Sequence, residues 1–144
     1  FESQLGSDLV EVLLDEVQIE QVFVNLLMNA LHATPEGGVI CVRSGMDKER
    51  SHVWAEIEDS GCGISQEHMK KIFEPFFSTK ASGTGLGLSV SYGIVRNHHG
   101  EMDVLSEEGK GTRFVVQFPT VETPHRRGEP QAAEVGAGVS RHPR

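Results

Sequence analysis

The sequence predicts an α/β fold, a two-layer sandwich in which helices cover one face of a mixed, mostly antiparallel sheet. Two segments carry apolar side chains at the spacing of an amphipathic helix, namely residues 16–33 and 86–97. Four shorter runs are rich in β-forming residues, namely 39–45, 52–58, 101–106 and 112–118. Because short polar turns join consecutive runs, we expect two antiparallel hairpins in one sheet and about three helices on one face.

The helix expected at residues 16–33 has recognisable ends. Asp15 is a candidate N-cap with Gln18 as its capping-box partner, and Pro35 followed by two glycines ends the helix. Apolar residues recur around so much of this helix that we expect it to be covered on most sides. They are Ile19, Val22, Phe23, Val24, Leu26, Leu27, Met28, Ala30 and Leu31. A short strand is expected before the helix, at residues 8–14.

The middle of the chain is less regular. Residues 66–72 are typical of a short helix with Ser65 as its cap, and residues 73–82 have no period and predict a loop. Gly100 is expected to end the helix at 86–97.

Length and composition limit the function. The chain has 144 residues, which is enough for one core, and its formal charge of −8 excludes non-specific binding of nucleic acid. Residues 1–119 are expected to fold, and residues 120–144 to form a flexible tail too poor in apolar residues to be ordered. We expect Cys41 and Cys62 to be reduced thiols. The first residue is not Met, which suggests a fragment of a longer protein. Within the given sequence we expect neither a signal peptide nor a membrane span.

Three amides stand four residues apart on the first helix, at Gln21, Asn25 and Asn29, so they line one helical face. A buried amide without a hydrogen-bond partner costs about 1–3 kcal/mol, so this trio is expected to have a use. Mg²⁺ prefers oxygen ligands, and a neutral amide oxygen can hold it without repelling phosphates. The trio therefore indicates a site for Mg²⁺ and phosphate.

A carboxylate framed by glycines follows at the end of a predicted strand, in the run Asp59-Ser60-Gly61-Cys62-Gly63. Alone, this pattern is also typical of a turn. A carboxylate would repel phosphates, but it can accept a hydrogen bond from the exocyclic amine of adenine. The glycines would let the backbone approach the base.

A glycine-rich segment opens the helix at 86–97, with the sequence Gly83-Thr84-Gly85-Leu86-Gly87-Leu88. The free N–H groups of a helix start attract anions, although such a run can also be a flexible loop. It is neither a P-loop nor a dinucleotide-binding loop. An aromatic run at 73–77 and a polar stretch at 78–82 precede this glycine-rich segment. Together they resemble a hinged lid, from which Lys80 could reach a terminal phosphate.

Taken together, these segments resemble the catalytic ATP-binding (HATPase_c) domain of two-component sensor histidine kinases, in the GHKL superfamily with gyrase, Hsp90 and MutL ATPases. Residues 21–33 look like its N box, 59–63 like its G1 box, 73–77 like its F box and 83–88 like its G2 box. Residues 109–114 look like its last shared segment. The run through Lys80 is most similar to the nitrogen-regulation type of sensor kinase.

The resemblance implies a Bergerat fold that binds ATP and Mg²⁺. It implies that Asn29 ligates Mg²⁺ with Asn25 at the phosphates, that Asp59 binds adenine, and that Lys80 joins both amides as a catalytic residue. His32 departs from the basic or polar residue that many relatives carry there. The residues expected to contact the nucleotide are Gln21, Asn25, Asn29, His32, Asp59, Gly61, Gly63, Ile64, Phe73, Lys80, Gly83, Thr84, Gly85, Leu86, Gly87, Leu88 and Thr112.

The resemblance also favours a kinase over a hydrolase. ATP hydrolases of this superfamily carry a Glu four residues before the metal-binding Asn, where this chain has Asn25. Since an amide is a very poor base, the site should hold ATP without hydrolysing it. The implied activity is transfer of the γ-phosphate to a histidine, and no histidine here has the acceptor pattern.

The acceptor histidine is therefore expected on a dimerisation and phosphoacceptor domain that precedes Phe1. The resemblance further implies a response regulator as partner, a homodimeric parent protein and a cytoplasmic location, with any inner-membrane anchor outside this chain. This fragment alone is expected to be monomeric. Two alternatives remain open at this point: a nucleotide-binding module without transfer activity, and a serine kinase of the anti-sigma type.

Overall fold

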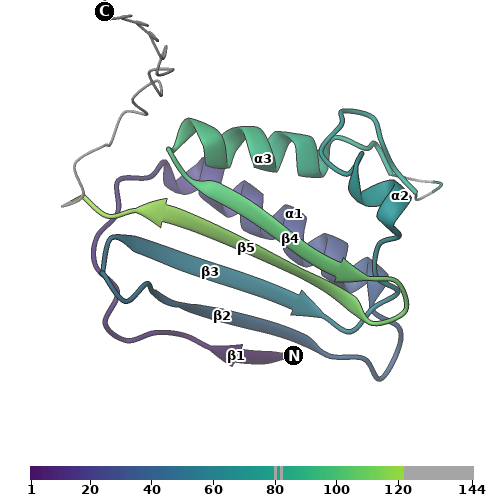
Figure 1. The fold of residues 1–144 in the computed structure, drawn as a ribbon, viewed down its shortest axis with the longest axis horizontal. Helices are drawn as coiled ribbons and strands as arrows, with labels where there is room; N and C mark the ends of the chain where they lie inside the picture. Colours follow the sequence, from purple (N-terminus) through teal and green to yellow (C-terminus); the bar gives the residue numbers. More distant parts are fainter. Residues whose placement is uncertain (80, 82, 122–144) are drawn as a thin grey trace, which may run out of the picture.

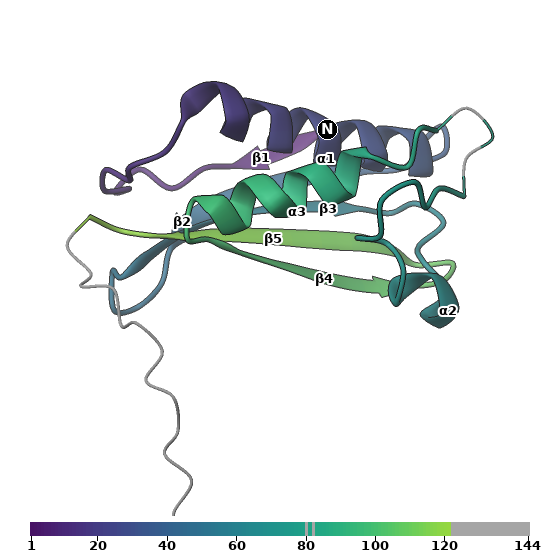
Figure 2. The same cartoon turned by 90° about the horizontal axis from the view of Figure 1, so that it is seen from above.

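The computed structural model describes residues 1–79, 81 and 83–121. It contains one five-stranded sheet in the order β1-β2-β3-β5-β4, with α1 and α3 packed on one face (Figures 1 and 2). The strands are β1 (Glu2–Gln4), β2 (Ile40–Met46), β3 (His52–Asp59), β4 (Glu101–Glu107) and β5 (Gly111–Pro119). The helices are α1 (Glu16–Ala33), α2 (Gln66–Met69) and α3 (Gly87–Asn97).

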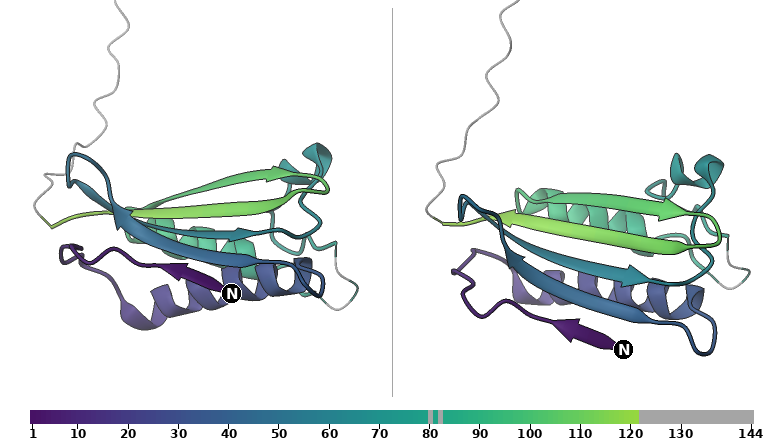
Figure 3. Two further views of the ribbon diagram at one scale, coloured as in Figure 1. Left: turned by 90° about the horizontal axis from the view of Figure 1, so that it is seen from below. Right: turned by 60° about the horizontal axis from the view of Figure 1, so that its bottom comes forward.

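The pairing of the strands confirms the expected mixed sheet. β2 pairs antiparallel with β3, β3 with β5, and β5 with β4, whereas β1 runs parallel to β2 at one edge. Figure 3 shows the sheet from its other face, with α1 and α3 behind it. The α/β two-layer prediction is therefore confirmed.

The prediction of a strand at residues 8–14 is wrong. These residues form no strand, and the edge of β2 is instead occupied by Glu2–Gln4. Because that edge is taken, residues 8–14 serve as the connection to α1, and Leu13 stays 86% exposed. Composition pointed to the wrong segment, because Glu2–Gln4 is polar and pairs with β2 through its backbone.

Helix α1 begins and ends at the predicted residues. The Asp15 carboxylate accepts a hydrogen bond from the Gln18 backbone N–H at 3.0 Å, as an N-cap does. The predicted capping box with Gln18 is wrong, because the Asp15 backbone N–H donates to Nε2 of His98 at 3.1 Å, and the Gln18 side chain donates to the Asp15 carboxylate at 3.3 Å. His98 lies just beyond the end of α3. Nδ1 of the same imidazole lies 2.8 Å from the Ile94 carbonyl oxygen, so His98 joins the start of α1 to the end of α3.

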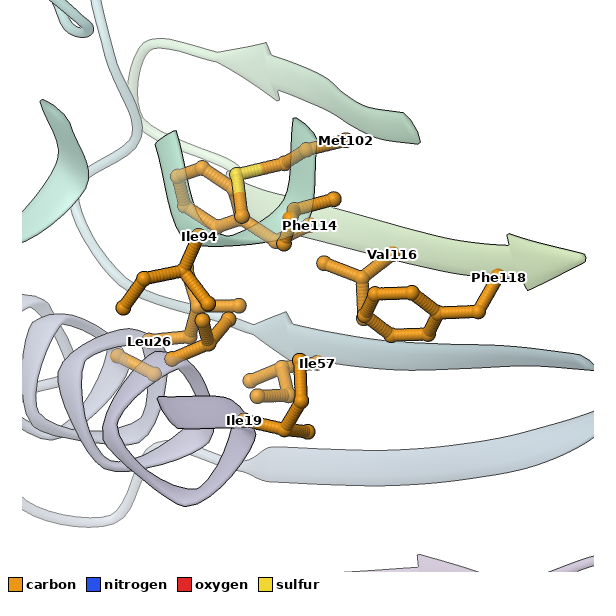
Figure 4. Close-up of a cluster of buried hydrophobic side chains, with 11 residues drawn as sticks. Ile19, Leu26, Ile57, Ile94, Met102, Phe114, Val116 and Phe118 are labelled. Atoms are coloured by element: carbon orange, nitrogen blue, oxygen red, sulfur yellow. The ribbon is translucent and has the colours of Figure 1, made fainter. Parts of the chain in front are cut away.

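The expectation that α1 is covered on most sides is wrong. Val24, Met28 and Leu31 are exposed, because the fold has only two layers and α1 meets the sheet on one side and α3 on the next. The buried stripe of α1 consists of Ile19, Val22, Leu26 and Ala30. The core joins it to side chains of α3 and of strands β3, β4 and β5 (Figure 4).

Leu26 lies in the centre of this core and is 1% exposed. Leu26→Ala is expected to lower the free energy of unfolding by about 2–5 kcal/mol, because it removes buried apolar surface and leaves a cavity. Urea denaturation measures the change. Leu31→Ala is the matched control on the same helix, since Leu31 is 59% exposed and should change stability by less than about 0.5 kcal/mol.

The ends of two other elements differ from the predictions. α2 stops at Met69 instead of reaching residue 72, although Ser65 caps it as expected by accepting from the His68 N–H at 3.3 Å. At the end of α3 the left-handed residue is His99, with φ of 59°, and not Gly100. Gly100 is required for packing instead, because a Cβ there would lie 2.7 Å from the Phe118 ring.

The ordered contacts continue one residue past the expected end of the domain. Thr120 is buried, and its backbone N–H donates to the Ser51 carbonyl oxygen at 2.9 Å. The remainder of the expected tail, from residue 122 onward, lies outside the described residues. None of the helices in the described part of the chain combines the length and the hydropathy needed to cross a bilayer.

Candidate functional site

A cavity of about 450 Å³ opens where α1, the end of β3, the start of β5 and the start of α3 converge. Most of the residues predicted as a site from the sequence line it. They are Asn25, Asn29, His32, Asp59, Gly63, Ile64, Gly83, Thr84, Gly85, Gly87, Leu88 and Thr112. Segments that are up to 87 positions apart in the sequence, from Asn25 to Thr112, thus meet around one space.

Some predicted site residues lie outside this lining. Gln21 is exposed on α1, one turn before Asn25, and does not reach the cavity. Gly61 is buried in the turn after β3, and Leu86 precedes α3 without lining the cavity. Phe73 packs against the core with its ring 4.8 Å from that of Tyr92. Lys80 lies outside the described residues, so its predicted role stays a prediction.

The amide end of the cavity is built by α1 and α3. The side-chain nitrogen of Asn25 donates to the Gly87 carbonyl oxygen at 3.3 Å and to the Ser91 hydroxyl at 3.0 Å. Because a carbonyl can only accept, the amide nitrogen must face α3, and Oδ1 is the atom that remains for a ligand. Asn29, one turn later, lines the same cavity.

The start of α3 faces this end of the cavity with its positive pole uncompensated. Leu86 provides no side-chain cap, and the first turn of α3 has no acidic residue. Gly85 and Gly87 line the cavity directly. Free N–H groups and the helix dipole favour an anion at such a position, and phosphate groups fit it best.

The opposite end of the cavity holds a buried acid. Asp59 closes β3 and is 6% exposed, and its Oδ1 accepts from the backbone N–H groups of Gly61 at 2.8 Å and Thr112 at 3.3 Å. Burial raises the pKa of this carboxyl, and the two N–H donors offset part of that rise. Both recorded hydrogen bonds are made by Oδ1, so Oδ2 is the atom that can accept from a ligand.

Backbone conformation explains two of the glycines. Gly63 has φ of +69°, and a Cβ there would collide with the backbone of Glu107 at the end of β4. Gly85 also has φ of +69°, and a Cβ there would lie 2.6 Å from the Phe76 carbonyl oxygen. The Phe76 N–H donates to the Gly85 carbonyl oxygen at 2.9 Å, so the aromatic segment and the glycine segment are locked together.

Sequence reasoning missed part of the lining. The missed residues are Met28, Ala33, Cys62, His68, Ile72, Phe77, Ser78, Thr79 and Phe114. Phe114 could have been found, because it lies two residues after Thr112 on β5 and must share its face of the strand. His68 could not have been found in this way. Its position in the lining depends on α2, which places the centroid of the His68 ring 5.5 Å from that of the Phe77 ring.

The described residues contain no group of three or more His, Cys, Asp and Glu side chains that could hold a metal. Besides His32, the polar side chains that α1 contributes to the lining are the uncharged amides of Asn25 and Asn29. Such a donor set fits a Mg²⁺ ion that arrives already bound to phosphate oxygens, since Mg²⁺ keeps waters and substrate phosphates as ligands.

Comparison with known proteins agrees with this geometry. Residues 14–122 match the family described as histidine kinase-, DNA gyrase B-, and HSP90-like ATPase. Sporulation kinase E of Bacillus subtilis (strain 168) is 41% identical over 124 residues, covering 85% of this chain and 16% of that protein. The sensor histidine kinase ZraS of Escherichia coli (strain K12) is 41% identical over 123 residues, covering 85% of this chain and 25% of that protein.

Solved structures give the same result. The catalytic domain of the histidine kinase ThkA has a TM-score of 0.71 at 36% identity, covering 83% of this chain and 77% of that chain. Full-length ShkA in complex with AMPPNP has a TM-score of 0.71 at 28% identity, covering 87% of this chain and 27% of that chain.

The chain therefore belongs to the HATPase_c family, and the fold is that of histidine kinase catalytic domains. This confirms the resemblance predicted from the sequence, whereas the nitrogen-regulation type stays a prediction. The chain spans only 16% and 25% of the two curated relatives described above, so it corresponds to one domain of those longer proteins.

Proposed function

We propose that this domain binds ATP with Mg²⁺ and donates the γ-phosphate to a histidine on a separate phosphoacceptor domain. The observation that carries the proposal is the polarity of the cavity. The uncapped start of α3 and the Asn25 amide lie at one end, and the buried Asp59 carboxylate lies at the other. The first end attracts phosphates, whereas the Asp59 carboxylate at the second end repels them. That carboxylate can instead accept a hydrogen bond from the exocyclic amine of adenine.

The described lining also supports transfer over hydrolysis. A hydrolase needs a base beside the phosphates, and at the position of Asn25 this chain has an amide whose nitrogen is already bonded to Gly87 and Ser91. Bound Mg²⁺ would supply charge neutralisation for the transferring phosphoryl group. The protein then contributes positioning: it fixes the phosphates at α3 and keeps the base at Asp59.

The names of the relatives support the partners expected for this domain in a longer protein. Because they are sensor and sporulation kinases, we infer a parent sensor kinase that forms a homodimer, phosphorylates its own histidine and passes the phosphate to a response regulator. From the same names we infer that this domain lies in the cytoplasm. ShkA, a structural relative, holds the ATP analogue AMPPNP, which supports an adenine nucleotide as the ligand.

The test combines this chain with ATP, Mg²⁺ and a separately produced helical-hairpin acceptor domain. We expect ATP binding by calorimetry and an acid-labile phosphate on the acceptor histidine. Acid-stable phosphate on serine would replace the proposal with a serine kinase. Binding without transfer to the cognate acceptor would reduce the domain to a binding module, and a folded chain that binds no ATP would overturn the proposal.

Asn29→Asp tests the metal and phosphate end. The new carboxylate would stand beside the triphosphate, and like charges at close range repel, so ATP affinity with Mg²⁺ should fall about tenfold and transfer with it. Calorimetry and the transfer assay measure both effects. Asn97→Asp is the control, because it adds the same charge at the exposed far end of α3 and should leave affinity unchanged. Equal affinities in both variants would show that the phosphates lie elsewhere.

A further inference from the structure

Ser106 on β4 is the centre of a small hydrogen-bond network behind the acid end of the cavity. Its hydroxyl oxygen accepts from the Ile64 backbone N–H at 2.8 Å. It lies 2.9 Å from the Gly111 carbonyl oxygen and 2.9 Å from the hydroxyl oxygen of Thr112. Ser106 itself does not line the cavity, whereas Ile64 and Thr112 do.

The valence of these groups fixes where the protons are. A serine hydroxyl has one proton to donate and two lone pairs that accept. The Gly111 carbonyl oxygen can only accept, so it accepts the hydrogen bond that the Ser106 hydroxyl donates. The Ile64 N–H can only donate, so its hydrogen bond occupies one lone pair of the Ser106 oxygen. The second lone pair must then receive the proton of the Thr112 hydroxyl. Ser106 is thereby saturated, and the Thr112 proton points away from the cavity.

This assignment determines what the cavity offers to a ligand. Thr112 is paired with Asp59 across β3 and β5, and both are 6% exposed and line the cavity. With its proton held by Ser106, Thr112 presents only a lone pair there. Asp59, with Oδ1 occupied by two N–H groups, also presents an acceptor. Two neighbouring acceptors suit an amino group, or a water that donates on to a ring nitrogen, and they disfavour a carbonyl oxygen.

We propose that Ser106 is a positioning residue for base recognition. By accepting a hydrogen bond from the Thr112 hydroxyl, it leaves only hydrogen-bond acceptors at this end of the cavity, which selects a 6-amino purine over a 6-oxo purine. The inference rests on the proposed binding of a nucleotide and adds a specificity residue that does not touch it. If Ser106 loses its hydroxyl, Thr112 can rotate and donate, and a 6-oxo purine is no longer disfavoured to the same degree.

The test is calorimetry of ATP and ITP, with Mg²⁺, on the whole chain. ITP carries a carbonyl where ATP carries the amine. Ser106→Ala should lower the ratio of the ITP and ATP dissociation constants about fivefold, the effect of one hydrogen bond. Ser106→Thr keeps a hydroxyl and should restore the ratio. In a Thr112→Val background, Ser106→Ala should leave the ratio unchanged, because no hydroxyl remains to be oriented.

Each outcome decides the proposal. A Ser106→Ala variant that weakens ATP and ITP by the same factor would make Ser106 a purely structural residue. If the wild-type chain binds neither nucleotide, the proposed function fails and not this inference alone. Should Ser106→Ala fail to fold, the Thr112 hydroxyl proton of the wild-type complex decides by NMR. A nuclear Overhauser contact with the Ser106 β-protons supports the assignment, and a contact with the bound base contradicts it.

Discussion

Asp59→Asn is expected to weaken ATP binding by about 10- to 150-fold, the worth of a hydrogen bond to a charged group. The substitution keeps the shape of the side chain, and its remaining oxygen can still accept from Gly61 and Thr112. It replaces Oδ2, the atom left for the ligand, with an amide that can donate. Because a donor suits a 6-oxo purine, the preference for ATP over GTP should shrink as well. Calorimetry with both nucleotides measures this.

The same substitution should leave the fold intact or make it more stable. Burial raises the pKa of Asp59 in the folded state, so the folded chain holds its proton more readily than the unfolded chain. The carboxyl thus favours folding below its unfolded pKa, and this contribution is lost as the pH rises through the folded pKa. At neutral pH the ionised group costs stability, and Asp59→Asn removes that cost.

Thermal unfolding at several pH values checks the sign. The variant should unfold at the same temperature as the wild type or above it at neutral pH, and the difference should vanish below about pH 4, where the carboxyl is protonated in both states. A variant that loses both stability and ATP binding would show general damage. A variant with unchanged preference for ATP over GTP would place the base pocket away from Asp59.

Gly85→Ala is expected to weaken ATP binding by about 5- to 150-fold, since a left-handed backbone costs a residue with a Cβ roughly 1–3 kcal/mol. Gly85 has φ of +69°, and an added Cβ would press on the backbone of Phe76. The aromatic and glycine segments must then separate, and binding has to bring them together again. The global fold should persist, because neither residue belongs to the core. Calorimetry and circular dichroism measure the two effects.

Gly93→Ala is the matched control. Gly93 lies inside α3, and an added Cβ there would meet nothing within 4 Å. Replacing a helical glycine with alanine usually stabilises a helix by roughly 0.5–1 kcal/mol, so this variant should unfold at a higher temperature and bind ATP normally. If Gly85→Ala also binds ATP normally, the contact between Gly85 and Phe76 does not shape the site.

Local patterns were sufficient for much of the fold. The bounds of α1 were predictable because a capping acid, a helical apolar stripe and a proline all agree there. The strand at the edge of the sheet was not predictable. Residues 8–14 carry the β-forming side chains, whereas Glu2–Gln4 are polar, and only the parallel pairing of β1 with β2 shows that residues 2–4 form the edge strand.

The site was predictable at its two ends and less so between them. Asn25 and Asp59 belong to short motifs whose chemistry can be inferred from residue type and spacing. The apolar wall formed by Ile72, Phe77 and Phe114 depends on how distant segments pack, and none of its three residues was predicted as part of the site. Ser106 could not be found at all, since its role depends on three partners that the β4–β5 hairpin and the turn after β3 bring together.

The two long helices are joined to each other at both ends of α3. His98 connects the end of α3 with the first residues of α1, and the Asn25 amide connects the start of α3 with the middle of α1. Because these contacts join α1 and α3 at two points, they favour movement of the two helices as one unit over the sheet. Displacement of α3 would then also move α1, and it would shift the phosphate end of the cavity relative to Asp59, which lies on the sheet.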